Sequence, residues 1–230
     1  MSSSTNQRMG EFSRLAQDLA ATEDETARLQ LAVDSAVRLV ERCDHAGFTV
    51  NEKGGVVTRV GSDALVRRAN ELQYEVGEGP CLDVRREQVT LVCVDLPSEH
   101  RYPTWADRVV SELGVGSMMS LLVYTDETSY GCLSLYADRG QRFDADDVAV
   151  GETIAAHLAV TLATGRRIHG LGLALHGRLA IGRAEGILME RLDIDEHQAF
   201  DYLRRVSSHT NRKLVAVCEE IARTRTLPEL

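Results

Sequence analysis

The stretch GRLAIGRAEGILMERLDIDEHQAFDYLRRVSSHTNRKLVAVCEEIAR, from Gly177 to Arg223, decides how the C-terminal part of the chain folds. Apolar residues recur along it at steps of three and four, the spacing that places side chains on one face of an α-helix. The first run ends near Leu192, and each of the two later runs begins beside a polar residue suited to capping a helix. The stretch therefore predicts three short helices packed on one another.

Polar residues mark where the second and third helices begin. Asp195 stands at the expected N-cap of the second helix, and Gln198 three residues later completes a pattern typical of a capping box. Thr210 or Asn211 can cap the third helix, and Pro228 prevents that helix from extending much further. We therefore expect helices after Asp195 and after the Thr210-Asn211 pair.

Basic and small polar side chains gather where the second and third helices are expected to meet. The cations are Arg204, Arg205, Arg212 and Lys213, and between them lie Ser207, Ser208, His209, Thr210 and Asn211. Backbone N–H groups and the helix dipole favour an anion such as phosphate at a helix N-terminus. The pattern is typical of a phosphate-binding surface, and equally of a helix face that is merely solvated.

Three motifs in this stretch resemble the ANTAR domain, a three-helix RNA-binding output module of bacterial transcription antiterminators. They are AEGILMER (184–191), AFDYLRRVS (199–207) and NRKL (211–214). The resemblance implies that the ligand is a structured RNA, a hairpin pair in an mRNA leader. The candidate RNA-binding residues are Arg178, Arg191, Arg204, Arg205, Ser207, Asn211, Arg212 and Lys213. Glu185 stands where the family usually has a cation, which puts an RNA contact at that position in question.

The charge of the chain is unevenly distributed. The 230 residues have a formal net charge of −9. Residues 165–226 contain 11 Arg and Lys against 8 Asp and Glu, whereas residues 1–164 contain 15 against 26. The acidic part repels phosphate, so RNA binding is expected to be confined to the C-terminal part and to weaken as salt rises.

Helical and strand-like patterns are mixed in the rest of the chain. Residues 1–7 are expected to be disordered. Helices are expected over 8–19, 29–40, 62–72, 104–113, from Pro80 and from Asp144, and strands over 46–51, 56–60, 89–96, 117–125 and 130–136. The first two strands, separated by a turn that contains the Gly54-Gly55 pair, are expected to form one hairpin, and the last two a second. Because strands and helices do not alternate regularly, the pattern predicts an α+β fold with an antiparallel sheet and helices on one of its faces.

Three further motifs resemble a GAF domain, a small-molecule sensory fold, over about residues 25–163. They are GEGPCLDV (77–84), VDL (94–96) and GCLSLYADRGQRFDADD (131–147). The resemblance implies a GAF-like antiparallel sheet with flanking helices. It leaves open whether a small-molecule ligand exists, because GAF domains differ widely in what they bind and many bind nothing. The expected organisation is a partly helical extension at 1–24, a GAF-like domain at 25–163, a helical linker at 164–177 and an ANTAR domain at 178–226.

A heptad-like seam joins the two expected domains. Its members are Ile154, Leu158, Thr161, Gly165, Ile168, Gly172, Leu175 and Leu179. Before Gly165 the favoured interpretation is packing against the chain's own sheet, and after it a coiled-coil dimer. We expect a homodimer through roughly Ile154 to Leu188, with Ile168, Leu175 and Leu179 near its axis. The glycines of the linker each cost about 1 kcal/mol relative to Ala in a helix, so its stability should be marginal.

The cysteines support a second hypothesis, a thiol-based redox sensor or reductase of GAF fold. Cys81 would lie in the first turn of a helix, with Cys93 or Cys132 as a partner. The favoured interpretation is a buried small hydrophobe, because no His or basic residue lies close in sequence to activate the thiol. The five cysteines, which include Cys43 and Cys218, show no CxxC spacing, so neither a disulfide scaffold nor a zinc site is expected.

No enzyme activity, cofactor or metal is predicted from the remaining patterns. A third hypothesis is a dimerising adaptor that has lost RNA binding, which Glu185 supports. No uninterrupted apolar stretch approaches the length of about 20 residues that a membrane span requires, and the polar N-terminus has no signal-peptide core. The expectation is therefore a cytoplasmic protein that does not contact a membrane.

Overall fold

The computed structural model of the chain describes residues 2–52, 55–87, 89–125 and 128–227. Contacts between residues divide the chain into two units, Met1–Gly165 and Arg166–Leu230. Each unit has a hydrophobic core of its own. The two units are therefore described separately.

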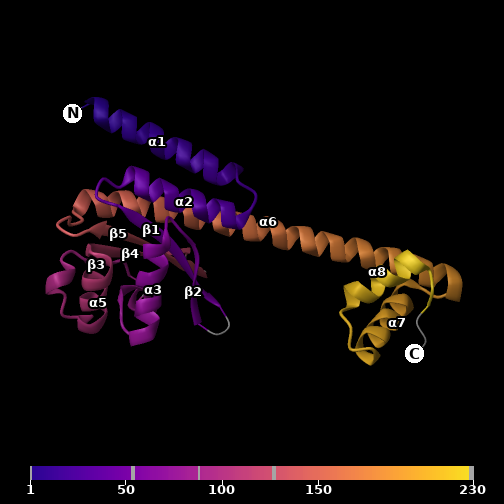
Figure 1. The fold of residues 1–230 in the computed structure, drawn as a ribbon. Coiled ribbons are helices and arrows are strands. Elements are labelled where there is room, and N and C mark those ends of the chain that lie inside the picture. The colour runs from indigo at the N-terminus through magenta and orange to yellow at the C-terminus, as the bar shows by residue number, and fades with distance from the viewer. Residues whose placement is uncertain (1, 53–54, 88, 126–127, 228–230) are drawn as a thin grey trace. The chain divides into compact units, whose positions relative to one another are not determined.

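An antiparallel sheet of five strands in the order β2-β1-β5-β4-β3 forms the centre of the first unit (Figure 1). The strands are β1 (His45–Glu52), β2 (Gly55–Gly61), β3 (Leu91–Cys93), β4 (Val115–Thr125) and β5 (Thr128–Asp138). The two expected hairpins, β1 with β2 and β4 with β5, are confirmed, although residues 53–54 and 126–127 of their turns lie outside the described residues. The strand expected over 89–96 is shorter and gives way to the 3₁₀ helix η1 (Leu96–Ser98), since Pro97 lacks the N–H that a longer strand would use.

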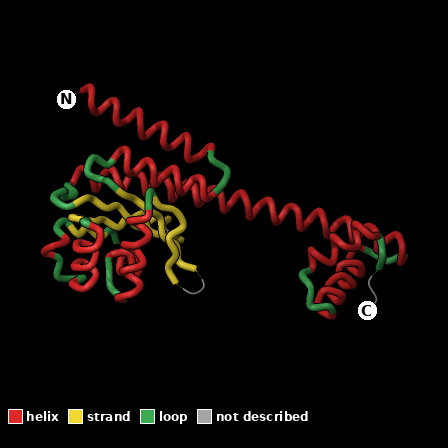
Figure 2. Tube along the Cα trace, viewed as in Figure 1, coloured by secondary structure: helices red, strands yellow, loops and turns green. Residues whose placement is uncertain are grey.

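Helices cover both faces of this sheet (Figure 2). One face carries α1 (Ser2–Ala21), α2 (Glu25–Leu39) and the first part of α6 (Ala145–Leu192), and the other carries α3 (Ala64–Val76), α4 (Pro80–Glu87) and α5 (Pro103–Leu113). The prediction of helices on one face only is wrong. Strand β4 shows why: every residue from Val115 to Val123 is buried, so side chains on both faces of the strand are covered. Such continuous burial is typical of a strand that is covered on both sides.

The N-terminal helix also differs from expectation, because residues 2–7 belong to α1 and are not disordered. Leu15 and Leu19 on its apolar side are buried, as predicted. The last turn of α1 is bound by the buried Arg28 of α2, whose Nε–H donates to the carbonyl of Leu19 at 3.0 Å and whose guanidinium also binds the carbonyl of Thr22. These bonds satisfy carbonyl groups that a helix C-terminus otherwise leaves unpaired.

Helix α6 is continuous from Ala145 to Leu192, so the expected linker and the first helix of the C-terminal module are one element. Ile154 and Leu158 are buried in the core of the first unit, as the favoured interpretation of this part predicted, while Leu188 is buried in the core of the second. Both ends of the expected dimer seam are therefore occupied by packing within the chain. From residue 168 to 179 the large apolar side chains are 52–67% exposed: Ile168, Leu171, Leu173, Leu175 and Leu179.

The second unit packs the last part of α6 against α7 (Glu196–His209) and α8 (Leu214–Thr224). The predicted capping box of α7 is confirmed: Asp195 accepts from the N–H of Gln198 at 2.8 Å, and Gln198 accepts from the N–H of Asp195 at 3.0 Å. The predicted cap of the third helix is wrong. Lys213 occupies the N-cap of α8 without a side-chain hydrogen bond, because the Thr210 hydroxyl already donates to the carbonyl of Val206 at the end of α7.

Candidate functional site

A groove of about 760 Å³ runs along the exposed face of α7 to the start of α8. Its lining residues are Gln198, Asp201, Arg204, Arg205, Ser207, Ser208 and Leu214. Most of them are three or four residues apart, so they share one face of α7. Ala199, Leu203 and Val206 on the opposite face are buried, which fixes the direction in which the arginines point.

The loop between α7 and α8 is held by hydrogen bonds within the loop itself. The Ser207 hydroxyl donates to the carbonyl of Arg212 at 2.6 Å, and the N–H of Arg212 donates to the carbonyl of Ser207 at 3.1 Å. Asn211 has a φ of 51°, a left-handed conformation that Asn adopts more readily than most residues. Ser207 therefore shapes the loop, and the predicted residues Asn211, Arg212 and Lys213 directly follow the groove.

The groove carries charges of both signs. Nη1 of Arg204 lies 3.6 Å from a carboxylate oxygen of Asp201, and Arg212 pairs with Glu220 at 2.5 Å. Among the residues that the structure describes, Arg205 and Lys213 form no ion pair. They can bind an anion without first breaking an existing pair. Sequence reasoning missed Asp201, although its helical spacing from Arg204 and Arg205 could have identified it.

Two of the predicted residues, Arg178 and Arg191, lie on α6 and do not line this groove. They are separated by about 20 Å along the helix, at about 1.5 Å per residue, so they cannot belong to one small patch. A second groove, of about 310 Å³, lies between α6 and α8 and is lined in part by Arg183 and Arg223, which sequence reasoning did not single out. There Nε2 of His176 lies 2.6 Å from a carboxylate oxygen of Glu219.

Glu185, the departure from the family pattern, does not line either groove. Burial and, secondarily, the charge of Glu196 raise the pKa of its carboxyl group. Its charge in turn contributes to the raised pKa of the Cys218 thiol, about 11, of which burial is the main cause. Glu185 is thus half-buried in the second unit and does not share the groove of the exposed arginines of α7.

Burial dominates the environment of the cysteines, although Arg101 Nη2 lies 3.4 Å from the sulfur of Cys93. All five are buried, and Cys81 is enclosed by polar side chains: Gln73 Nε2 donates to its sulfur at 3.1 Å, and Ser134 Oγ lies 3.0 Å away. Burial raises the pKa of the Cys81 thiol, and it also raises those of Cys43 and Cys93. Since the thiolate is the reactive form, burial and a raised pKa both oppose reaction. Within the described ranges, no group of three or more His, Cys, Asp or Glu residues is suited to hold a metal ion.

Alkylation provides a direct measurement of this burial. We expect iodoacetamide to modify all five cysteines slowly near neutral pH in the native protein, and rapidly after denaturation. Mass spectrometry of peptides over time checks each position separately. Rapid modification of Cys81 in the native protein, at the rate of a free thiol in a peptide, would instead favour the redox hypothesis.

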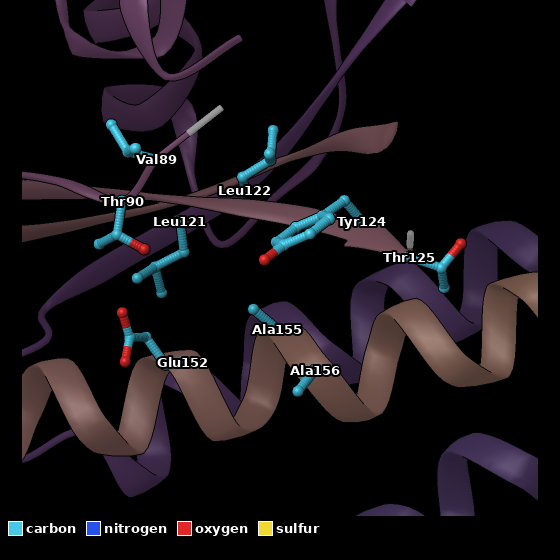
Figure 3. A pocket seen from close by; sticks show the side chains of 9 residues that line it. All are labelled: Val89, Thr90, Leu121, Leu122, Tyr124, Thr125, Glu152, Ala155 and Ala156. Carbon is cyan, nitrogen blue, oxygen red and sulfur yellow. The ribbon is translucent and has the colours of Figure 1, made fainter. Parts of the chain in front are cut away.

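A third groove, of about 590 Å³, lies in the first unit between α6, the C-terminal end of β4 and residues 89–90 (Figure 3). Its apolar lining residues are Val89, Leu121, Leu122, Ala155 and Ala156, and its polar ones are Thr90, Tyr124, Thr125 and Glu152. Helix α6 can approach the sheet closely here because residue 151 is Gly: a Cβ atom at that position would lie 2.7 Å from Cδ1 of Leu121. One wall of the groove is therefore the helix that continues into the second unit.

Family models match both parts of the chain. The GAF domain model matches residues 22–163, and the ANTAR domain model matches residues 170–221. The ANTAR match begins within the stretch expected to be a linker, in agreement with the continuity of α6. Among curated proteins, none matches the chain.

Solved structures show similarity to the first unit. The GAF domain of a phosphoenolpyruvate-protein phosphotransferase from Coxiella burnetii is 16% identical, with a TM-score of 0.55, and the match covers 71% of this chain and 96% of that one. Free methionine-R-sulfoxide reductase from Neisseria meningitidis, in complex with its substrate, is 14% identical, with a TM-score of 0.56, and the match covers 73% and 95%. At such low identity these similarities establish the fold alone.

Proposed function

The chain belongs to the GAF domain family and carries a C-terminal ANTAR domain, and from this premise we propose that its ANTAR domain binds a structured RNA under the control of its GAF domain. ANTAR domains are RNA-binding antitermination modules, and GAF domains are sensory modules, so the architecture fits a regulator rather than an enzyme. The observation that carries the RNA-binding surface is the groove on α7, where Arg204 and Arg205 are exposed beside Ser207 and Ser208.

The chemistry of this surface suits an RNA backbone. Arginine presents several N–H donors in a fixed geometry that matches phosphate oxygens, and the adjacent serine side chains can bind sugar or phosphate groups. Lys213 lies at the N-cap of α8, where the helix dipole favours a negative charge. The acidic residues of the GAF domain repel phosphate, so the contact is confined to the ANTAR domain.

A homodimer would allow two ANTAR domains to bind two hairpins of one RNA. Binding of the first hairpin raises the effective concentration of the second, so a modest affinity for each hairpin is sufficient. The bound hairpin pair would exclude a terminator from the same transcript. The apolar side chains of α6 that remain exposed, from Ile168 to Leu179, support dimerisation through this stretch.

The continuity of α6 supports control by the GAF domain. Ile154 and Leu158 of this helix belong to the GAF core, and Ala184 and Leu188 belong to the ANTAR core. If α6 packs in the GAF core in two alternative arrangements, a ligand that binds one of them more tightly shifts the population toward it. Such a shift can change how the α6 helices of the dimer pack on each other.

We place the protein in the cytoplasm, where GAF and ANTAR domains are typically found. An 18-residue segment of α6 is apolar enough for a membrane span, but 39% of that segment is buried within the protein. Core helices of soluble proteins meet the same criterion. The exposed apolar residues of α6 are better explained by a second copy of the helix.

RNA binding is tested by replacing Arg204 and Lys213 together with Ala. Affinity for a hairpin-pair RNA, chosen from RNAs that co-purify with the protein, should fall by about tenfold or more, because hydrogen bonds to charged groups contribute about 1.5–3 kcal/mol each. The dependence of log K on log salt should also flatten, by about 0.7–0.9 for each phosphate group that the variant no longer binds. Fluorescence anisotropy at several salt concentrations measures both quantities.

A charge-matched control is the Arg14→Ala, Arg86→Ala variant, which removes two exposed cations from the first unit. Its RNA affinity and salt dependence should equal those of the wild type. If the Arg204→Ala, Lys213→Ala variant also binds like the wild type, these residues do not contact RNA. A wild type that itself binds no structured RNA would instead make a dimerising adaptor without RNA binding the better explanation.

A further inference from the structure

The described lining of the groove between β4 and α6 contains one carboxylate, several hydroxyl groups and apolar side chains, and we propose that this groove binds a small organic ammonium ion with an apolar body. The inference rests on the proposed function in one respect: it treats the groove as the sensory input of the GAF domain. The groove lies beside α6 at the end of β4, where Leu121 faces the helix and Leu122 faces the other side of the sheet. A ligand there would contact the output helix directly.

Glu152 supplies the charge that selects a cation. Its side chain is exposed and forms no hydrogen bond or ion pair within the part of the chain that the structure describes. Among the described residues that line the groove none is basic, and the other polar groups are the hydroxyls of Thr90, Tyr124 and Thr125. Figure 3 shows the Glu152 carboxylate rising from α6 toward Thr90 on the opposite wall. An ammonium group placed between them would find oxygen acceptors on both sides.

The remaining lining residues favour an apolar or aromatic body. Among the apolar lining residues Val89 and Ala156 are exposed, and Tyr124 is a large aromatic residue that remains 52% exposed. In Figure 3 the Tyr124 ring lies across the groove from α6, above Ala155. An aromatic ring face attracts a cation and also packs against another ring. The volume of about 590 Å³ lies within the range of small-molecule sites, about 300–1,000 Å³.

The opposite face of the sheet offers a contrast. There the polar side chains are buried and bonded to one another: the Tyr136 hydroxyl donates to Asn70 at 2.8 Å, and Gln73 accepts from the N–H of Cys81 at 2.8 Å. These groups already have partners. Glu152 does not, so a ligand at Glu152 gains an ionic contact without displacing one.

The test uses two probes of nearly the same shape, 2-phenylethylammonium and the neutral 2-phenylethanol, with the full chain in isothermal titration calorimetry. The ammonium ion should bind about tenfold more tightly than the alcohol, because a charge-assisted hydrogen bond is substantially stronger than a neutral one. In Glu152→Gln the two probes should bind equally. Glu190→Gln, which removes an exposed carboxylate from the same helix outside the groove, should keep the preference of the wild type.

Several outcomes would overturn the proposal. These are equal binding of the two probes by the wild type, no binding of either, or an unchanged preference in Glu152→Gln. Conversion of a dimer to monomers by Glu152→Arg would instead assign the groove to a second copy of the chain. RNA is absent from these titrations, so a lack of amine binding does not contradict the proposed RNA binding. Likewise, a lack of RNA binding does not contradict amine binding at Glu152.

Discussion

Replacing Leu203 by Ala is expected to unfold the ANTAR domain while the GAF domain remains folded. Leu203 is fully buried at the centre of the core that α7 shares with α6 and α8. A buried Leu→Ala substitution costs about 2–5 kcal/mol. A module of this size seldom has more than about 3–5 kcal/mol of stability, so the substitution should remove most of it.

Thermal unfolding followed by differential scanning calorimetry measures this effect. The wild type should show a transition for each unit, and Leu203→Ala should lose or strongly lower only the transition of the ANTAR domain, together with RNA binding. Leu173→Ala, the same chemical change at a residue that is 60% exposed, should alter stability by no more than about 0.5 kcal/mol. If Leu203→Ala lowers the temperatures of both transitions equally, the two units unfold cooperatively and are not independent folding units.

The double substitution Leu175→Glu, Leu179→Glu is expected to convert the proposed homodimer into monomers. The two leucines are 61% and 52% exposed in the single chain and lie on the expected seam. A dimer would bury both residues of each chain, and burial of each Leu contributes about 1.5–3 kcal/mol. Because each Leu is already partly buried in the single chain, their loss, together with repulsion between the new carboxylates, should raise the dissociation constant by about 10²- to 10⁵-fold.

Light scattering over a range of concentrations measures the oligomeric state. Leu173→Glu provides the control, because position 173 is equally exposed but lies two residues from Leu175, on a different side of α6. That variant should remain dimeric. A wild type that is monomeric at high concentration while it binds RNA, or a double variant that stays dimeric, would place the dimer interface elsewhere.

The sequence by itself determined the local elements and the family. Strand-like runs identified both hairpins, the first with the help of a Gly pair, and Asp195 with Gln198 identified the start of α7 to the residue. These features depend on residues that are close together in the chain, so the pattern of neighbouring side chains is sufficient. The motifs around Pro80 and Arg204 identified the GAF and ANTAR domains, which the family models confirm.

Only the tertiary structure decided which residues share a surface. It placed helices on both faces of the sheet, separated Arg178 and Arg191 from the groove on α7, and brought Asp201 into that groove. The groove at Glu152 joins α6 to β4, two elements whose register depends on packing across the sheet. Helical and strand periodicity reports which face of an element is apolar, but not which distant element covers that face. That choice follows from the packing of the whole core, which no local pattern contains.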